Sequence, residues 1–139
     1  MKDVLISIKG TQVNGESTDV TEFTTEGKFS EKGDKTLLSY EESEALGVPG
    51  VTTYVRIENE KVVIQRRGKF NSRLLVEKNK RNLCHYETEY GPMMLGVFGE
   101  VITNKINFDG SLYMSYTLDV NCSMISRNEI EIKVKEVEN

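Results

Sequence analysis

Hydrophobic and polar residues alternate along most of the chain with a period of two. The clearest runs lie at residues 51–58, 112–120 and 129–135. Weaker alternation is found at residues 4–8, 23–29, 38–42 and 62–66. Successive side chains of a β-strand point to opposite faces of the sheet, so this pattern predicts strands with one buried face and one wet face.

Turn-forming residues separate these runs and keep the connections short. They are Asn14–Gly15, Gly33–Asp34, Pro49–Gly50, Asn59–Glu60, Gly91–Pro92 and Asp109–Gly110. The Asp109–Gly110 pair between two alternating runs predicts a tight hairpin, because both central residues of such a turn need positive φ angles. Short connections make neighbouring strands antiparallel. About ten candidate strands lie between residues 2 and 137, and the one helical candidate is the short stretch from Glu41 to Leu46.

An antiparallel meander leaves two exposed edges unless the sheet closes on itself. Gly96 and Gly99 interrupt an otherwise apolar segment, and interior glycines often mark the bends that a small barrel needs. We therefore predict an all-β fold, a single antiparallel, meander-type closed barrel of about eight strands that spans residues 1–139 as one domain. A β-sandwich is the alternative. A barrel of this size either fills with side chains or holds one small ligand.

The composition agrees with a folded protein and limits the cellular compartments in which it is expected. The 139 residues are 37% apolar and 29% charged, with a net charge of −4, which disfavours global disorder. The first residues lack the apolar core of a secretion signal, and the longest apolar run, 93–98, is far shorter than the ~20 residues of a membrane-spanning helix. Two cysteines without an export signal favour reduced thiols. We expect a soluble, cytoplasmic protein with no membrane partner.

A series of residues along the chain resembles the YwiB-like family, a group of uncharacterised bacterial proteins. They are Leu38–Glu42, Thr53, Arg66 with Gly68, Tyr86, Tyr90–Gly91, Gly110 and Tyr116–Asp119. Their order and spacing carry the resemblance, which runs from about residue 3 to residue 137. The resemblance implies a calycin-type, lipocalin-like β-barrel, in agreement with the period of two. It implies no activity and no catalytic residues.

Two charged residues stand at every-second positions that are otherwise apolar, so they are expected to face the barrel interior. Arg66 and Glu42 each continue an apolar stripe of a predicted strand. A buried charge is costly unless it is paired, so we expect Arg66 and Glu42 to meet. Hydrogen bonds to this pair can come from Tyr40, Tyr86 or Tyr116.

The candidate ligand site in the interior comprises Tyr40, Glu42, Thr53, Arg66, Tyr86 and Tyr116. In this interpretation the protein is a non-catalytic binding barrel, and Arg66 binds the anionic head group of a small, partly apolar ligand. In a structural interpretation the same arginine belongs to an internal ion pair that fixes strand register, or it reaches out at the rim. A third interpretation is an enzyme that uses Tyr40, Glu42 and Arg66, for which no nucleophile and base are visible. No cofactor is implied.

The residue types of common catalytic and metal centres are present but badly placed. Cys84 and His85 are adjacent in a predicted strand, so their side chains point to opposite faces and cannot act as a nucleophile–base pair. His85, Glu87 and Glu89 share one face, yet the chain has no second histidine. A solvated strand face explains these residues, and we predict no metal ligands and no catalytic residues.

Positive charge is concentrated in one segment of this acidic chain. Residues 61–81 contain eight basic residues and one acidic residue, whereas both flanking segments are acidic. The expected surface patch comprises Arg67, Lys69, Arg73, Lys78, Lys80 and Arg81. Such a patch attracts an acidic protein, nucleic acid or a second copy of the chain, or it pairs with neighbouring strands of the monomer. The shortage of aromatic residues disfavours nucleic acid.

The basic segment supports an alternative function. In this interpretation the barrel is filled, and the protein is a structural or interaction protein. Its 61–81 surface then serves for homodimerisation or for an acidic partner.

Overall fold

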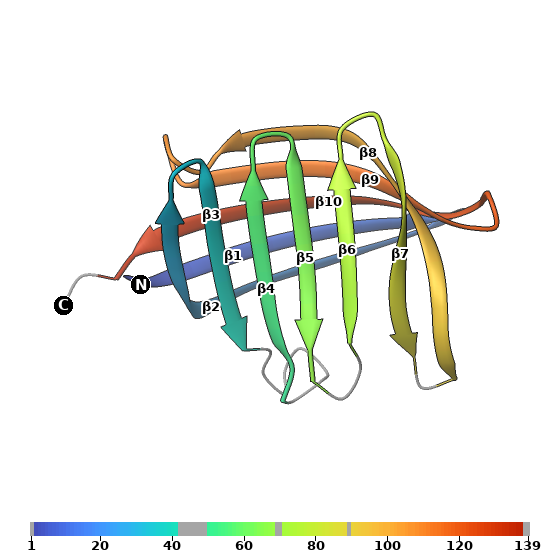
Figure 1. Ribbon diagram of the computed structural model, residues 1–139, viewed down its shortest axis with the longest axis horizontal. Helices are drawn as coiled ribbons and strands as arrows, with labels where there is room; N and C mark the ends of the chain where they lie inside the picture. The colour runs from blue at the N-terminus through green and yellow to red at the C-terminus, as the bar shows by residue number, and fades with distance from the viewer. Residues whose placement is uncertain (1, 42–49, 69–70, 89, 138–139) are drawn as a thin grey trace.

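The computed structural model of the chain describes residues 2–41, 50–68, 71–88 and 90–137. These residues form ten antiparallel strands that follow one another as a meander and close into a barrel (Figure 1). The strands are β1 (Lys2–Asn14), β2 (Ser17–Lys32), β3 (Lys35–Glu41), β4 (Thr52–Glu58), β5 (Lys61–Arg67), β6 (Ser72–Glu77), β7 (Arg81–Thr88), β8 (Gly91–Lys105), β9 (Ser111–Val120) and β10 (Ser123–Glu136). Each strand pairs with the next along the chain, and β1 closes the ring by pairing with β10.

The predicted all-β class, the meander and the closure are confirmed, whereas the predicted number of about eight strands is wrong. Strands β3 to β7 contain six to eight residues, and the other five contain ten to sixteen. The short strands form one layer that crosses the long strands of the other layer (Figure 1).

Two long strands pass from one layer to the other. Strand β2 pairs with β1 from Ser17 to Phe29, but with β3 only from Gly27 onward. Strand β8 changes register next to Gly99, where a Cβ atom would lie 2.7 Å from the carbonyl carbon of Glu77. Gly99 thus lies at an irregularity of β8, where the backbone of Glu77 leaves no room for a side chain. Gly96 instead lies in regular pairing, opposite Asp119 of β9.

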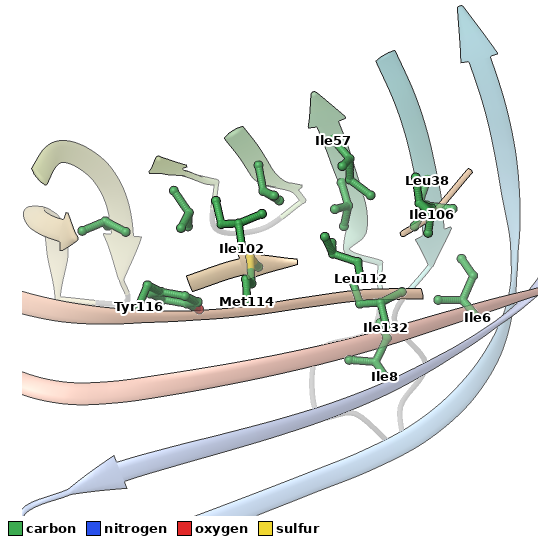
Figure 2. Close-up of a cluster of buried hydrophobic side chains, with 14 of the residues drawn as sticks. Ile6, Ile8, Leu38, Ile57, Ile102, Ile106, Leu112, Met114, Tyr116 and Ile132 are labelled. Carbon is green, nitrogen blue, oxygen red and sulfur yellow. The ribbon is translucent and has the colours of Figure 1, made fainter. Parts of the chain in front are cut away.

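The alternating residues that were expected to face inward do so. Their side chains form one hydrophobic cluster from both layers (Figure 2). The most deeply buried members include Ile6, Leu38, Ile57, Leu112, Met114 and Ile132. This cluster fills the half of the barrel near the turns at 33–34, 59–60 and 78–80, which we call the hairpin end. The opposite end of the barrel, where β3, β5 and β7 end and β4, β6 and β8 begin, we call the loop end.

The predicted turns differ in detail from the observed ones. Asn59 has a positive φ angle in the turn between β4 and β5. The connection at Asp109–Gly110 is longer than the expected two residues and extends over 106–110, with Asp109 Oδ1 accepting a hydrogen bond from the backbone N–H of Ser111. Glu41 ends β3, and the rest of the helical candidate lies outside the described residues. Within the described ranges, no helix is long and apolar enough to cross a membrane.

Candidate ligand site in the barrel

A layer of polar side chains crosses the inner face of five consecutive strands near the loop end. Its members are cross-strand partners: Tyr40 on β3, Thr53 on β4, Arg66 on β5, Ser72 on β6 and Tyr86 on β7. We call these five residues the polar layer. Two residues further into the barrel, the same strands carry Leu38, Val55, Ile64, Leu74 and Cys84. The apolar core therefore forms the floor beneath the polar layer.

Arg66 stands at the centre of the polar layer. Its cross-strand partners are Thr53 and Ser72, which are only 1% and 8% exposed. The residue is half-buried, and its Nε atom is shielded from solvent. Arg66 thus lies on the inner face of β5 with its Nε atom buried, and its role as an interior cation stays a prediction. A guanidinium group carries five N–H donors.

Tyr116 on β9 extends the polar surface to the other layer of the barrel. It is 5% exposed and lies at the end of the core cluster far from Ile6 (Figure 2). Burial raises the pKa of the Tyr116 hydroxyl to about 12, with a smaller contribution from Tyr86. Tyr116 also lines a cavity of about 210 Å³ with Gln12 and Asn128.

Tyr40 connects the polar layer with a groove at the bend of β2. Its ring packs against Phe23, with ring centroids 6.1 Å apart and planes tilted by 58°. The groove has a volume of about 730 Å³ and is also lined by Thr25, Gly27 and Thr52. One end of the polar layer is therefore reached from outside the barrel.

Five of the six predicted interior residues face the inside of the barrel: Tyr40, Thr53, Arg66 and Tyr86 near the loop end, and Tyr116 on β9 of the other layer. Glu42 lies outside the described residues, so its ion pair with Arg66 stays a prediction. Sequence reasoning missed Ser72, although it shares the parity of the inward-facing Leu74 and Val76. It also missed Asn128, which donates a hydrogen bond to Ser126 Oγ at 3.0 Å in the interior.

Cys84 and His85 do not form a catalytic pair. Cys84 is buried, and its thiol lies 3.2 Å from the backbone nitrogen of Leu75. His85 is exposed, and its Nε2 atom lies 3.8 Å from Glu87 Oε1. The two side chains occupy opposite faces of β7, as the alternation predicted.

The chain is similar to known proteins in both sequence and structure. A family model described as "Domain of unknown function (DUF1934)" matches residues 6–132. The chain belongs to the DUF1934 family. Its structure is similar to the crystal structure of the ywiB protein from Bacillus subtilis, with a TM-score of 0.83 and 18% sequence identity over 99% of this chain and 93% of that chain. At this identity the similarity shows a shared fold alone. The predicted membership of the YwiB-like family is confirmed. No curated protein matches this DUF1934 chain.

The residues of the predicted basic patch divide between Arg67 and Arg73, exposed on the outer face of β5 and β6, and residues elsewhere on the DUF1934 domain. Lys78 Nζ lies 3.7 Å from Glu60 Oε1, and Lys80 Nζ lies 3.8 Å from Glu77 Oε2 at the hairpin end. Arg67 lies toward the loop end, where it pairs in register with Thr52. Lys69 lies outside the described residues.

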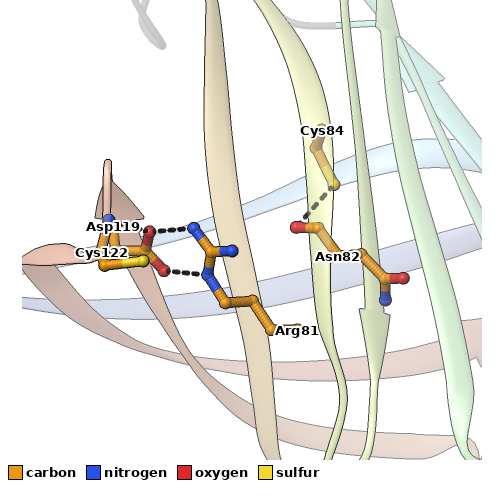
Figure 3. Close-up of polar contacts among 5 residues, drawn as sticks. All are labelled: Arg81, Asn82, Cys84, Asp119 and Cys122. Atoms are coloured by element: carbon orange, nitrogen blue, oxygen red, sulfur yellow. Dashed lines mark hydrogen bonds and ion pairs between the residues drawn. The ribbon is translucent and has the colours of Figure 1, made fainter.

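Arg81 forms a two-pronged ion pair with Asp119 on the outer surface of the DUF1934 barrel (Figure 3). Arg81 Nε donates to Asp119 Oδ2 at 2.9 Å, and Nη2 donates to Oδ1 at 2.6 Å. Oδ1 also accepts a hydrogen bond from the backbone N–H of Cys122 at 3.1 Å. The hydrogen bonds from Arg81 hold the pKa of the Asp119 carboxyl below its usual range. This pair serves the fold, because it joins β7 to β9 across β8 and links both strands to the turn at Cys122.

Proposed function

We propose that the protein is a non-catalytic binding barrel that takes a small, anionic and partly apolar ligand into the loop-end half of its interior. The observation that supports this proposal is the polar layer, with Arg66 at its centre and the apolar core directly beneath it. The layer is built on paired strands, so its side chains are preorganised. A site with one interior charge over an apolar floor suits a ligand with a head and a short tail.

The residues of the polar layer suggest how the head group binds. A guanidinium group binds a carboxylate or a phosphate through two parallel hydrogen bonds. The hydroxyls of Thr53 and Ser72 flank Arg66, and those of Tyr40 and Tyr86 end the row. Burying a cation is costly unless an anion or acceptors face it, so an interior arginine favours an anion beside it. Glu42 and an anionic ligand are alternative partners for that position.

The apolar part of the ligand has suitable neighbours. Partly buried hydrophobic residues packed against the core include Phe23, Ile64, Leu74 and Leu118. Ile64 and Leu74 lie directly beneath Arg66 and Ser72 in the same strands. A ligand whose head binds Arg66 therefore places its tail against these side chains. His85 points away from the interior, which favours binding over acid–base chemistry.

Native mass spectrometry of gently purified protein is the first test. The wild type should carry an additional bound mass, which Arg66→Met should lose and Arg73→Met should keep. Arg73 is the matched control, because it lies on the neighbouring strand but is exposed on the outer face. If the wild type carries no bound species and Arg66→Met only lowers stability, the internal ion pair explains Arg66 and the proposal is wrong.

Defined probes make a second test independent of co-purification. Octanoate has an anionic head and an apolar tail, inorganic phosphate has only the head, and octanamide has a neutral head. Octanoate should raise the melting temperature of the wild type and of Arg73→Met, but not of Arg66→Met. Octanamide should have no effect. Glu42→Gln should retain the octanoate response, because the proposal assigns recognition of the head group to Arg66.

A further inference from the structure

The outer face of β3 to β6 carries its charges in rows that differ from one another. At the hairpin end, Lys35, Glu58, Lys61 and Glu77 are successive cross-strand partners, so the sign of the charge alternates. The next row is Leu37, Arg56, Val63 and Leu75, and the row after it is Ser39, Tyr54, Gln65 and Arg73. These two rows contain arginines and no acidic residue.

Three exposed arginines mark this surface: Arg56, Arg67 and Arg73. We call them, with the two rows above, the arginine face. The guanidinium carbon of Arg67 lies 5.7 Å from the centre of the Tyr54 ring, a cation–π contact. In the part of the chain that the structure describes, no acidic side chain lies within ion-pair distance of these arginines. The arginine face is therefore a concentrated positive surface on an acidic protein.

Apolar residues lie between these arginines. Val63 points outward yet is only 7% exposed, and Leu37 and Leu75 are half-buried on either side of it. Long arginine side chains commonly lie along such an apolar surface and keep their charged groups in water. A partner with both acidic and apolar groups matches this surface better than a purely charged one.

The hairpin of β1 and β2 has the complementary character. Residues 10–26 contain four acidic residues and no lysine or arginine. On the outer face of this hairpin, Val13 and Val20 are 37% and 58% exposed. Glu22 shares the outward face of Val20, and Glu16 lies at the turn. Lys9 is the cross-strand partner of Glu22, and Arg127 is that of Val13, so the hairpin is acidic and apolar only toward its tip. The chain thus carries both an acidic, apolar hairpin tip and a basic, apolar surface.

We propose that the arginine face is a docking surface for a second copy of this chain, and that it binds the β1–β2 hairpin of that copy. In this contact Glu16 and Glu22 lie against the arginines, which accept carboxylates in two-pronged geometry. Val13 and Val20 cover the apolar residues between the arginines. Each copy carries both halves of the contact, so two copies can bind each other reciprocally around a twofold axis.

Charge complementarity favours this partner over nucleic acid. The chain has a net charge of −4, so its acidic surfaces repel a polyanion. Tyr54 is the one aromatic residue in the two rows, whereas single-stranded nucleic acids are bound by several stacking rings. A two-stranded hairpin covers a small area, so the dimer should be weak and sensitive to salt. We expect the dissociation constant to rise about tenfold or more between low and high salt.

Sedimentation velocity on charge-reversed variants tests the proposal. The face variant carries Arg56→Glu and Arg73→Glu, and the hairpin variant carries Glu16→Lys and Glu22→Lys. The wild type should dimerise at concentrations on the order of 100 μM in low salt, whereas each variant alone should be monomeric. An equal mixture of the two variants should dimerise again, because both reciprocal contacts then join opposite charges.

Control variants distinguish this contact from nonspecific charge attraction and from misfolding. Lys135→Glu, at an exposed position of β10 opposite Leu5 and away from the hairpin tip, should leave the dimer unchanged. Arg56→Gln with Arg73→Gln should weaken the dimer without introducing new repulsion. Circular dichroism confirms that each variant is folded. A monomeric wild type, or a mixture that stays monomeric, overturns the proposal. If the monomer instead binds a single-stranded RNA through Arg56 and Arg73, the face belongs to nucleic acid and the proposal is equally wrong.

Discussion

Arg81 and Asp119 meet across a strand to which neither belongs. Arg81 is on β7 and Asp119 is on β9, and β8 lies between them. The residue of β8 beneath the ion pair is Gly96, where a Cβ atom would lie 2.5 Å from Arg81 Nη2. The ion pair therefore depends on the absence of a side chain at Gly96.

We predict that Gly96→Ala destabilises the protein by about 1–3 kcal/mol, because the new methyl group displaces the Arg81 guanidinium and the Asp119 carboxylate. In an Arg81→Ala background the same substitution should cost much less. A double-mutant cycle by urea unfolding measures this coupling. Gly99→Ala is the control, since its Cβ atom meets backbone atoms of Glu77 and its cost should not depend on Arg81. Equal costs for Gly96→Ala in both backgrounds would contradict the predicted clash with the ion pair.

Tyr116 should make stability fall at high pH. Its pKa in the folded protein is about 12, above the value of about 10 in the unfolded chain. The folded state thus favours the neutral hydroxyl, so this stabilisation is complete below pH 10 and is lost as the pH rises through 12. The loss amounts to about 3 kcal/mol. Urea unfolding at several pH values should show a steeper decline for the wild type than for Tyr116→Phe, and parallel curves would refute the assignment.

Cys122 occupies a backbone conformation that suits glycine. The turn between β9 and β10 places Asn121 at φ 52° and Cys122 at φ 68°, as in hairpin turns that favour Asn–Gly. A residue with a Cβ atom is strained at such a φ angle. Cys122→Gly should therefore stabilise the protein by about 1 kcal/mol, measured by thermal unfolding under reducing conditions. Cys122→Ala removes the thiol without relieving the strain and should give no such gain.

Two adjacent leucines test which way the strands face. Leu38 is fully buried, whereas Leu37 lies half-buried on the outer surface. Leu38→Ala should cost about 2–5 kcal/mol, because it leaves a cavity in the core. Leu37→Ala should cost less than about 1 kcal/mol, because solvent and neighbouring side chains occupy the space. Chemical denaturation of both variants provides the comparison, and similar costs would show that the assigned faces are wrong.

The orientation of the interior residues could be predicted because it follows from a local rule. In a strand every second side chain faces the same way, so the apolar neighbours of Tyr40, Thr53 and Arg66 reveal the direction of all three. The same rule would have identified Ser72 if small polar residues had been considered together with Leu74.

Other features depend on contacts between distant parts of the chain. Gly96 suggested a bend, but its lack of a side chain instead makes room for the ion pair of Arg81 and Asp119. These two residues are 38 positions apart in sequence. No local pattern reports such a contact. The alternation gave about ten candidate strands, which is the observed number, and the barrel of about eight strands was wrong because closure depends on pairing between distant strands such as β1 and β10. The Asp109–Gly110 turn is longer than expected because Ile106 is drawn into the core, where it is 5% exposed.

The polar layer also holds its functional groups at fixed intervals. Its five side chains come from neighbouring strands, and strands are spaced about 4.8 Å apart. A molecule lying along this row meets one functional group per strand, so the backbone hydrogen bonds fix the intervals between those groups. The lengths of the connecting loops can then vary among related barrels without altering the intervals that a guest molecule has to match.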